Sequence, residues 1–147
     1  MPRPAPFRLD PASYPVRETV QTRYQDLDAM GHINNVAFAA MFENARVRFN
    51  HALGRLNRSD GLRAVVARNE INYLAEGSYP ADVEIATGIG RIGNRSWEML
   101  AVMHQQGVAL ATCDTTIVMT HPEGAVPADF RARLEPMLVT GGADAQA

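Results

Sequence analysis

The chain has 147 residues, a length that suits one domain with a sizeable core and is too short for two. Its formal charge of −2 leaves no basic footprint for nucleic acid, and a single cysteine, Cys113, excludes an internal disulfide and a cysteine-based zinc site. No apolar run approaches the length of a transmembrane helix or a signal-peptide core. We therefore expect a soluble, cytoplasmic protein with no nucleic-acid or membrane partner.

The N-terminal residues 1–15 hold five of the nine prolines, which predicts an extended arm. Whether this arm lies across a neighbouring subunit or is loose stays open. From Val16 to Tyr24 apolar and polar residues alternate, a pattern typical of a half-buried strand. We assign residues 16–138 to a single domain and residues 139–147 to a flexible tail.

A long helix is predicted from about residue 35 to residue 53, with Gly54 as its C-terminal cap. Residues 36–42 are apolar on every side, so the helix must be wrapped by other structure. Glu43 follows this run directly, and Arg46 lies three residues on, which favours an ion pair over a catalytic role for Glu43.

The turn before this helix carries the strongest chemical signal. Asn34 or Asn35 is a good N-cap, since the side-chain oxygen can accept a hydrogen bond from an N–H of the first helical turn. Gly31 permits a positive φ, so the chain can bend sharply there. Asp28 can then lie beside the positive end of the helix, whereas Asp26 is better explained as a turn-shaping residue.

After the helix, the chain changes to strand-like patterns joined by short turns. We predict two-residue hairpin turns at Gly93-Asn94 and Gln106-Gly107, and a short amphipathic helix within 128–137. A strand, a long helix and then an antiparallel meander indicate an α+β fold in which the sheet curls around the helix. The four strand-like segments cover about 63–74, 82–92, 95–105 and 108–120.

Several other motifs do not support a function. The run Gly88-x-Gly90-x-x-Gly93 matches a dinucleotide-binding fingerprint, but it lies within a strand and no helix follows it, so its glycines are better explained by a bulge or a close contact. The four histidines lack metal-ligand spacing, and there is no Gly-x-Ser-x-Gly elbow. We therefore expect neither a metal nor an organic cofactor.

The stretch around the predicted helix start resembles the signature of hotdog-fold acyl-CoA thioesterases of the 4-hydroxybenzoyl-CoA thioesterase type. Its His-x-Asn-Asn variant is similar to the branch shared with plant acyl carrier protein thioesterases. The resemblance implies a hotdog fold, an antiparallel β-sheet wrapped around a long central α-helix, and a homodimer or homotetramer. The residues that carry it are Tyr24-x-Asp26-x-Asp28-x-x-Gly31-His32-x-Asn34-Asn35 and Phe42-Glu43-x-Ala45-Arg46.

By this resemblance the reaction is hydrolysis of an acyl-CoA thioester to a free acid and coenzyme A. Asp28 is the implied catalytic carboxylate, either as nucleophile or as general base, and the backbone N–H of Asn35 polarises the thioester carbonyl. The remaining expected site residues fall into two sets. Those that shape the site are Tyr24, Gly31, His32 and Asn34, and those that contact coenzyme A are Arg91, Arg95 and Ser96.

Two other functions fit the same residues. A hydratase or dehydratase acting on enoyl-CoA would use Asp28 and His32 as base and acid, although the following Asn34-Asn35 pair looks more like thioesterases. A non-catalytic acyl-CoA binding domain is also compatible, because fold does not fix function. An assay with enoyl-CoA would test for the hydratase or dehydratase. Tight binding of acyl-CoA without hydrolysis would support the binding domain.

Overall fold

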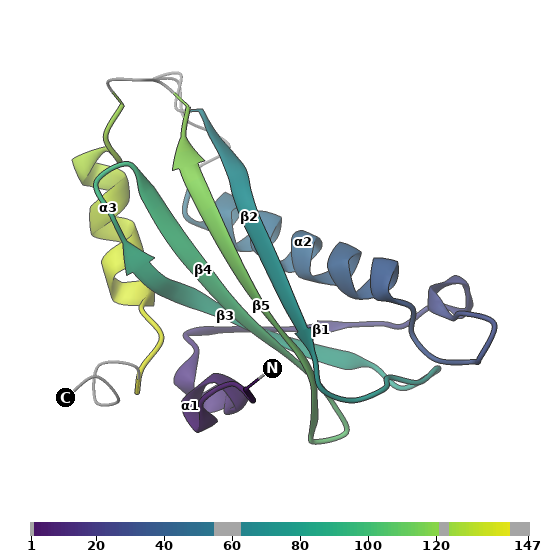
Figure 1. The fold of residues 1–147 in the computed structure, drawn as a ribbon. Helices are drawn as coiled ribbons and strands as arrows, with labels where there is room; N and C mark the ends of the chain where they lie inside the picture. The colour runs from purple at the N-terminus through teal and green to yellow at the C-terminus, as the bar shows by residue number, and fades with distance from the viewer. Residues whose placement is uncertain (1, 55–62, 121–123, 142–147) are drawn as a thin grey trace.

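The computed structural model describes residues 2–54, 63–120 and 124–141. Five antiparallel strands form one sheet in the order β1-β3-β4-β5-β2, and the long helix α2 lies across one face of it (Figure 1). Within the described ranges, no helix combines the length and apolarity needed to cross a membrane. The elements in chain order are α1 (Pro6–Leu9), η1 (Pro11–Ser13), β1 (Val16–Val20), η2 (Tyr24–Asp26), α2 (Asn35–Ala52), β2 (Ala64–Tyr73), β3 (Val83–Ile92), β4 (Ser96–Gln105), β5 (Val108–Met119), α3 (Ala128–Leu134) and η4 (Glu135–Met137).

This arrangement confirms the predicted α+β class and hotdog architecture. The helix begins at Asn35 as expected, and Gly54 follows it with a φ of +81°. Gln106 and Gly107 form a two-residue turn with φ values of 50° and 79°. The other hairpin was predicted one residue too early. The Gly93 N–H donates to the Ser96 carbonyl at 2.7 Å, which places the turn on the two residues between them.

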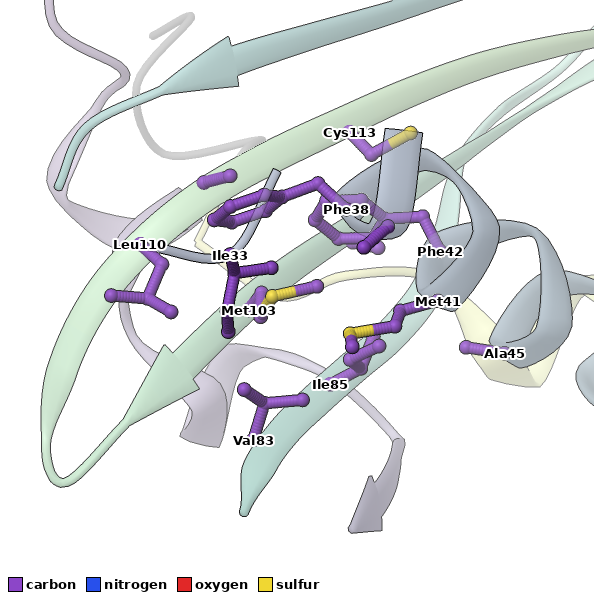
Figure 2. Close-up of a cluster of buried hydrophobic side chains, with 13 residues drawn as sticks. Ile33, Phe38, Met41, Phe42, Ala45, Val83, Ile85, Met103, Leu110 and Cys113 are labelled. Atoms are coloured by element: carbon purple, nitrogen blue, oxygen red, sulfur yellow. The ribbon is translucent and has the colours of Figure 1, made fainter. Parts of the chain in front are cut away.

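The main core lies between α2 and the facing side of the sheet. Along β3, side chains alternate between the two faces, so Ile85 packs under α2 while Ala86 belongs to a cluster on the other face. Figure 2 shows Phe38 and Phe42 of the helix within the main cluster. A second cluster forms where α3 covers the other end of the sheet, with Phe130 fully buried edge-on to Trp97.

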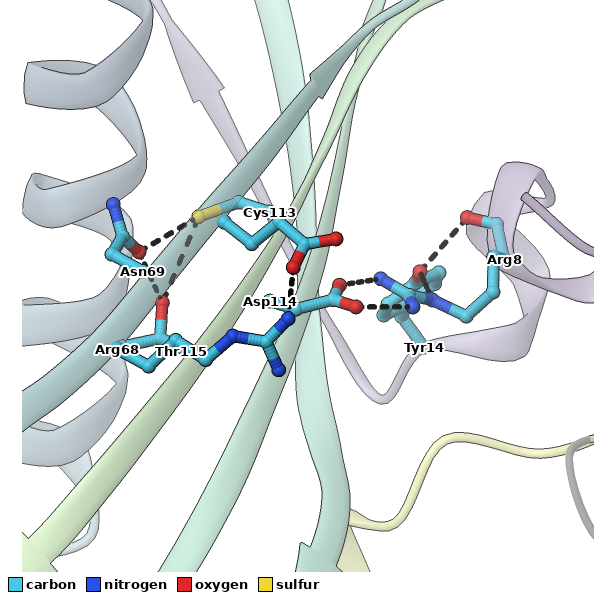
Figure 3. Close-up of polar contacts among 8 residues, drawn as sticks. Arg8, Tyr14, Arg68, Asn69, Cys113, Asp114 and Thr115 are labelled. Carbon is cyan, nitrogen blue, oxygen red and sulfur yellow. Dashed lines mark hydrogen bonds and ion pairs between the residues drawn. The ribbon is translucent and has the colours of Figure 1, made fainter. Parts of the chain in front are cut away.

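The N-terminal arm is not extended as predicted over its whole length, because residues 6–9 form one helical turn and residues 11–13 a 3-10 turn. A partly buried ion pair fixes this segment to the sheet (Figure 3). The Arg8 guanidinium donates to both carboxylate oxygens of Asp114, at 3.2 and 2.5 Å, and its Nε donates to the Tyr14 hydroxyl at 3.1 Å. Burial disfavours the charged guanidinium, but these bonds outweigh it and raise the pKa of Arg8.

The glycines of the discarded fingerprint have a structural explanation. The β3–β4 register shifts between Ile89 and Arg91, which is the expected bulge at Gly90. A Cβ on Gly88 would come within 2.7 Å of Pro15, so the arm could not approach the strand there. Because β3 leads into β4 and no helix follows, the motif has no dinucleotide-binding context.

The division of the chain at residues 15 and 138 stays a prediction. Residues 139–141 of the expected tail are described, and the Val139 N–H donates to the Ile89 carbonyl at 2.8 Å. The Thr140 N–H likewise donates to the Ser13 carbonyl at 2.9 Å. The start of the tail is thus bonded to the domain, and residues 142–147 lie outside the described residues.

The Arg8–Asp114 pair generates a stability prediction. Asp114→Asn should lower the free energy of unfolding by about 2 kcal/mol, because it leaves a guanidinium that is largely buried without its charged partner. Urea unfolding measures this change. Glu135→Gln, at an exposed position, is the matched control and should change stability by less than about 0.5 kcal/mol. Equal effects of the two variants would contradict an anchoring role for the pair.

Candidate active site

The segment between β1 and α2 folds into a loop whose base is closed by an isolated antiparallel bridge between Leu27 and Ile33. Asp26 organises this base. Its backbone carbonyl accepts from the Asn34 N–H at 2.8 Å, and its buried side chain accepts from the Arg23 N–H at 2.8 Å. Asp26 therefore has the turn-shaping role that the sequence favoured, and it fixes where the helix begins.

Asp28 lies in the exposed tip of this loop. Its Oδ1 accepts hydrogen bonds from the N–H groups of Met30 at 2.9 Å and His32 at 3.1 Å. Gly31 has a φ of +80° and donates its N–H to the Asp28 carbonyl at 3.0 Å, as the predicted sharp turn requires. Among the described residues nothing hydrogen-bonds Oδ2. One carboxylate oxygen therefore shapes the loop, and the other is available for chemistry.

The start of α2 provides a hydrogen-bond donor in the residue that follows the N-cap. Asn34 is the N-cap, and its Oδ1 accepts from the Ala37 N–H at 2.7 Å. Asn35 is the first helical residue, and no acceptor within the described part of the chain bonds its N–H. This amide stands at the positive end of an 18-residue helix. It can therefore donate to a developing negative charge.

Asp28 and Asn35 line the same open cleft, which has a volume of about 400 Å³. The residue that carries the carboxylate and the first residue of α2 thus share one cavity, together with apolar lining residues. Such an arrangement can hold a carbonyl oxygen while an oxygen nucleophile approaches the carbon. The other lining residues are His32, Ile33, Phe38, Tyr73, Leu74, Ala75 and Glu76.

Glu76 is a cleft residue that the sequence did not reveal. Its Oε2 lies 3.1 Å from Nε2 of His32, so these two lining side chains pair with each other. The neighbouring Gly77 carbonyl accepts from the Ile33 N–H at 3.0 Å, which ties the segment after β2 to the Asp28 loop. No local motif marks Glu76, because its contact with the loop depends on long-range packing.

Tyr24 was expected to line the site but lies outside the cleft. It is 79% exposed, and its ring packs edge-on against Tyr79 with the centroids 6.0 Å apart. The first strand was predicted to reach Tyr24, but in the structure it ends at Val20, and Tyr24 begins the 3-10 turn η2. The alternation of apolar and polar residues therefore continues past the end of the strand. For this reason it wrongly predicts that the Tyr24 side chain is buried.

The three expected coenzyme A contacts are also not brought to the cleft within one chain. Arg95 and Ser96 lie at the β3–β4 turn, whereas Tyr73 lies at the opposite end of the sheet, roughly 30 Å away for a ten-residue strand. Arg95 donates to the Met119 carbonyl at 3.5 Å. Arg91 lines a separate cavity beneath the N-terminal arm, on the face away from α2.

Other chemistry is not favoured by the described residues. Burial raises the pKa of the Cys113 thiol, which keeps it in the unreactive neutral form. Glu43 lies 3.9 Å from Arg46, in agreement with the predicted pairing within the helix. Across the described ranges, no group of three or more histidine, cysteine, aspartate or glutamate side chains could hold a metal ion.

Comparison with known proteins identifies the family of the chain. The model of the thioesterase-like superfamily matches residues 22–136, and the chain belongs to this family. A Bacillus subtilis protein, YsmA, of uncharacterized function, is 25% identical over 91 residues, which span 62% of each chain.

Two of the solved structures that share the fold are thioesterases by name. A predicted thioesterase from Bacillus stearothermophilus is 28% identical with a TM-score of 0.75, and the match covers 83% of this chain and 95% of that one. A thioesterase from Thermus thermophilus, complexed with coenzyme A and Zn, is 27% identical with a TM-score of 0.74, over 85% and 95% of the two chains.

The N-cap that positions Asn35 can be tested by stability. Asn34→Ala should lower the free energy of unfolding by about 1 kcal/mol, because the Ala37 N–H loses its acceptor, while Asn34→Asp should retain stability. Asn44→Ala, at an exposed position in the middle of the helix, is the control and should be neutral or slightly stabilising. If both alanine variants behave alike in urea unfolding, Asn34 does not cap α2.

Proposed function

We propose that this protein hydrolyses acyl-CoA thioesters, with Asp28 as the reacting carboxylate and the N–H of Asn35 as the donor to the carbonyl oxygen. The observation that carries the proposal is that Asp28 and the start of α2 line one cleft. Membership of the thioesterase-like superfamily supports this reaction class. The coenzyme A complex of the Thermus thermophilus relative supports the same class of substrate.

In the proposed reaction the thioester carbonyl oxygen accepts the Asn35 N–H as negative charge develops on it. One such donor is worth roughly 3 kcal/mol in other enzymes. In one route Oδ2 of Asp28 attacks the carbonyl carbon, which expels the coenzyme A thiolate and forms a mixed anhydride that water cleaves. In the other, Asp28 removes a proton from an attacking water, the tetrahedral adduct expels the coenzyme A thiolate, and the proton passes from Asp28 to the thiolate. Both routes return a free acid, coenzyme A and an ionised Asp28.

The neighbouring side chains hold this geometry. The backbone N–H groups of Met30 and His32 hold the Asp28 carboxylate, and the Gly31 N–H holds the Asp28 backbone carbonyl. Asn34 fixes the first turn of the helix. The pairing between His32 and Glu76 restrains the loop from the opposite side of the cleft. These residues are proposed to position the reacting groups.

A homodimer is part of the proposal, because strand β2 lies at the edge of the sheet and pairs with β5 on one side. Val65 and Val66 on this edge are 54% and 46% exposed. Arg68 and Glu70 flank Asn69 and contact each other within one chain. In an antiparallel pairing of two β2 strands centred on Asn69, each arginine would face the glutamate of the second copy.

Such a pairing would also explain how residues far from the cleft of their own chain could contact coenzyme A. Two antiparallel β2 strands bring the β3–β4 end of one copy to the Tyr73 end of the other. Arg95 and Ser96 would then act on the cleft of a second chain, whereas Arg91 lies on the face away from α2 and this pairing does not explain its expected role. Their role remains a prediction that depends on the dimer, and a further pairing of dimers would give a tetramer.

Asp28→Asn tests the reaction. The amide oxygen can still accept from Met30 and His32, so the variant should fold normally, while kcat for acyl-CoA hydrolysis should fall at least about 100-fold. Release of free coenzyme A measures the rate. Asp82→Asn, an exposed position outside the cleft, should leave the rate unchanged. Unchanged turnover in Asp28→Asn, or hydration of enoyl-CoA without thioester hydrolysis by the wild type, would contradict the proposal.

A charge exchange tests the dimer. Arg68→Glu should shift the protein toward monomer, because it would set two carboxylates opposite each other, and adding Glu70→Arg should restore the wild-type state. Sedimentation velocity at neutral pH measures the distribution. A monomeric wild type, or a double variant that behaves like Arg68→Glu, would contradict this register.

A further inference from the structure

Two aromatic rings from different elements line the cleft. Phe38 projects from the first turn of α2, and Tyr73 is the last residue of β2. Their rings meet edge to face, with the centroids 5.4 Å apart and the planes at 84°. The Tyr73 hydroxyl lies 3.5 Å from the Asn35 carbonyl, so its side chain spans from the sheet edge to the helix start.

Behind Phe38 the protein is densely packed. Phe38 is 3% exposed and belongs to the buried cluster drawn in Figure 2. In the same cluster, Met103 and Leu110 of the sheet are 0% and 1% exposed. Native packing leaves few voids of useful size in such a cluster. An acyl chain therefore cannot continue from the cleft toward the sheet without displacing core side chains.

The direction along β2 is closed in a different way. Asn69, Ile71 and Tyr73 follow one another on the same face of the strand. Beyond the Tyr73 ring, Ile71 is partly buried, and the Asn69 amide oxygen then accepts from the Thr115 hydroxyl at 2.7 Å (Figure 3). A long acyl chain in this direction would pass the Tyr73 ring and then cover polar groups, which is unfavourable.

We propose that Tyr73, backed by Phe38, ends the acyl-binding site and restricts the enzyme to thioesters with short acyl groups. This inference rests on the proposed thioesterase function and adds the class of acyl group to it. We assign the limit on acyl-chain length to Tyr73, because its exposed ring can be removed without disturbing the core. Phe38, by contrast, is part of the core. The polar group at Asn69 sets a second, more distant limit.

The test compares kcat/KM for butyryl-CoA and octanoyl-CoA in the wild type and in Tyr73→Ala. The wild type should prefer butyryl-CoA. Tyr73→Ala should raise the octanoyl-to-butyryl ratio by about tenfold or more, because a chain of intermediate length can then lie over Ile71. Tyr73 is 52% exposed, so removing its ring should leave the fold intact, which circular dichroism checks.

Two matched variants test whether the change in chain-length preference comes from the Tyr73 ring or from a general effect of the substitution. Tyr73→Phe retains the ring and should keep the wild-type ratio, which shows that the ring and not the hydroxyl limits the chain. Tyr79→Ala removes a ring of similar exposure, 44%, that lies outside the cleft, and it should also keep the ratio.

Three results would overturn the inference: a wild type that prefers octanoyl-CoA, a Tyr73→Ala variant with the wild-type ratio, or a Tyr79→Ala variant with the same shift as Tyr73→Ala. Each of these presupposes measurable hydrolysis by the wild type. A wild type that hydrolyses no acyl-CoA at all would instead contradict the proposed function, so the two failures are distinguishable.

Discussion

Two backbone hydrogen bonds hold the candidate site together. The Asn34 N–H donates to the Asp26 carbonyl, and the Ile33 N–H donates to the Gly77 carbonyl, at 2.8 and 3.0 Å. The first fixes the start of α2 against the turn before it, and the second fixes the loop against the segment after β2. Because both are backbone bonds, the loop tip with Asp28 has a defined position relative to the first free amide of the helix. The proposed chemistry depends on that relation.

The fold was largely predictable because its signals are local and regular. The helix start, its glycine cap and the four later strands follow from apolar periodicity and turn residues within short windows. The failures come from competing tertiary contacts. The proline-rich arm folds into helical turns because Arg8 reaches Asp114, which is 106 residues away, and no local pattern contains that pairing. The first strand ends early because Asp26 draws the chain into a 3-10 turn.

In the candidate site, too, the local part was predictable and the part that depends on tertiary contacts was not. Asp28, Gly31, Asn34 and Asn35 lie close together in the sequence, so their mutual geometry follows from one turn and one helix start. The opposite wall of the cleft comes from the end of β2 and the segment after it. Its residues meet the loop only through strand register and helix packing, which sequence spacing does not encode. The residues expected to bind coenzyme A lie at the other end of the sheet, and relating them to this cleft requires a second chain.

The central claim is that Asp28 and the Asn35 amide act on the same carbonyl. A crystal structure with a non-hydrolysable acyl-CoA analogue tests it most directly. We expect the analogue's carbonyl oxygen at about 2.7–3.1 Å from the Asn35 nitrogen, with Asp28 Oδ2, or a water bound to it, at about 3–3.5 Å from the carbonyl carbon. An analogue whose carbonyl lies away from the helix start, or in the cavity beneath the N-terminal arm, would rule out a shared action of Asp28 and Asn35.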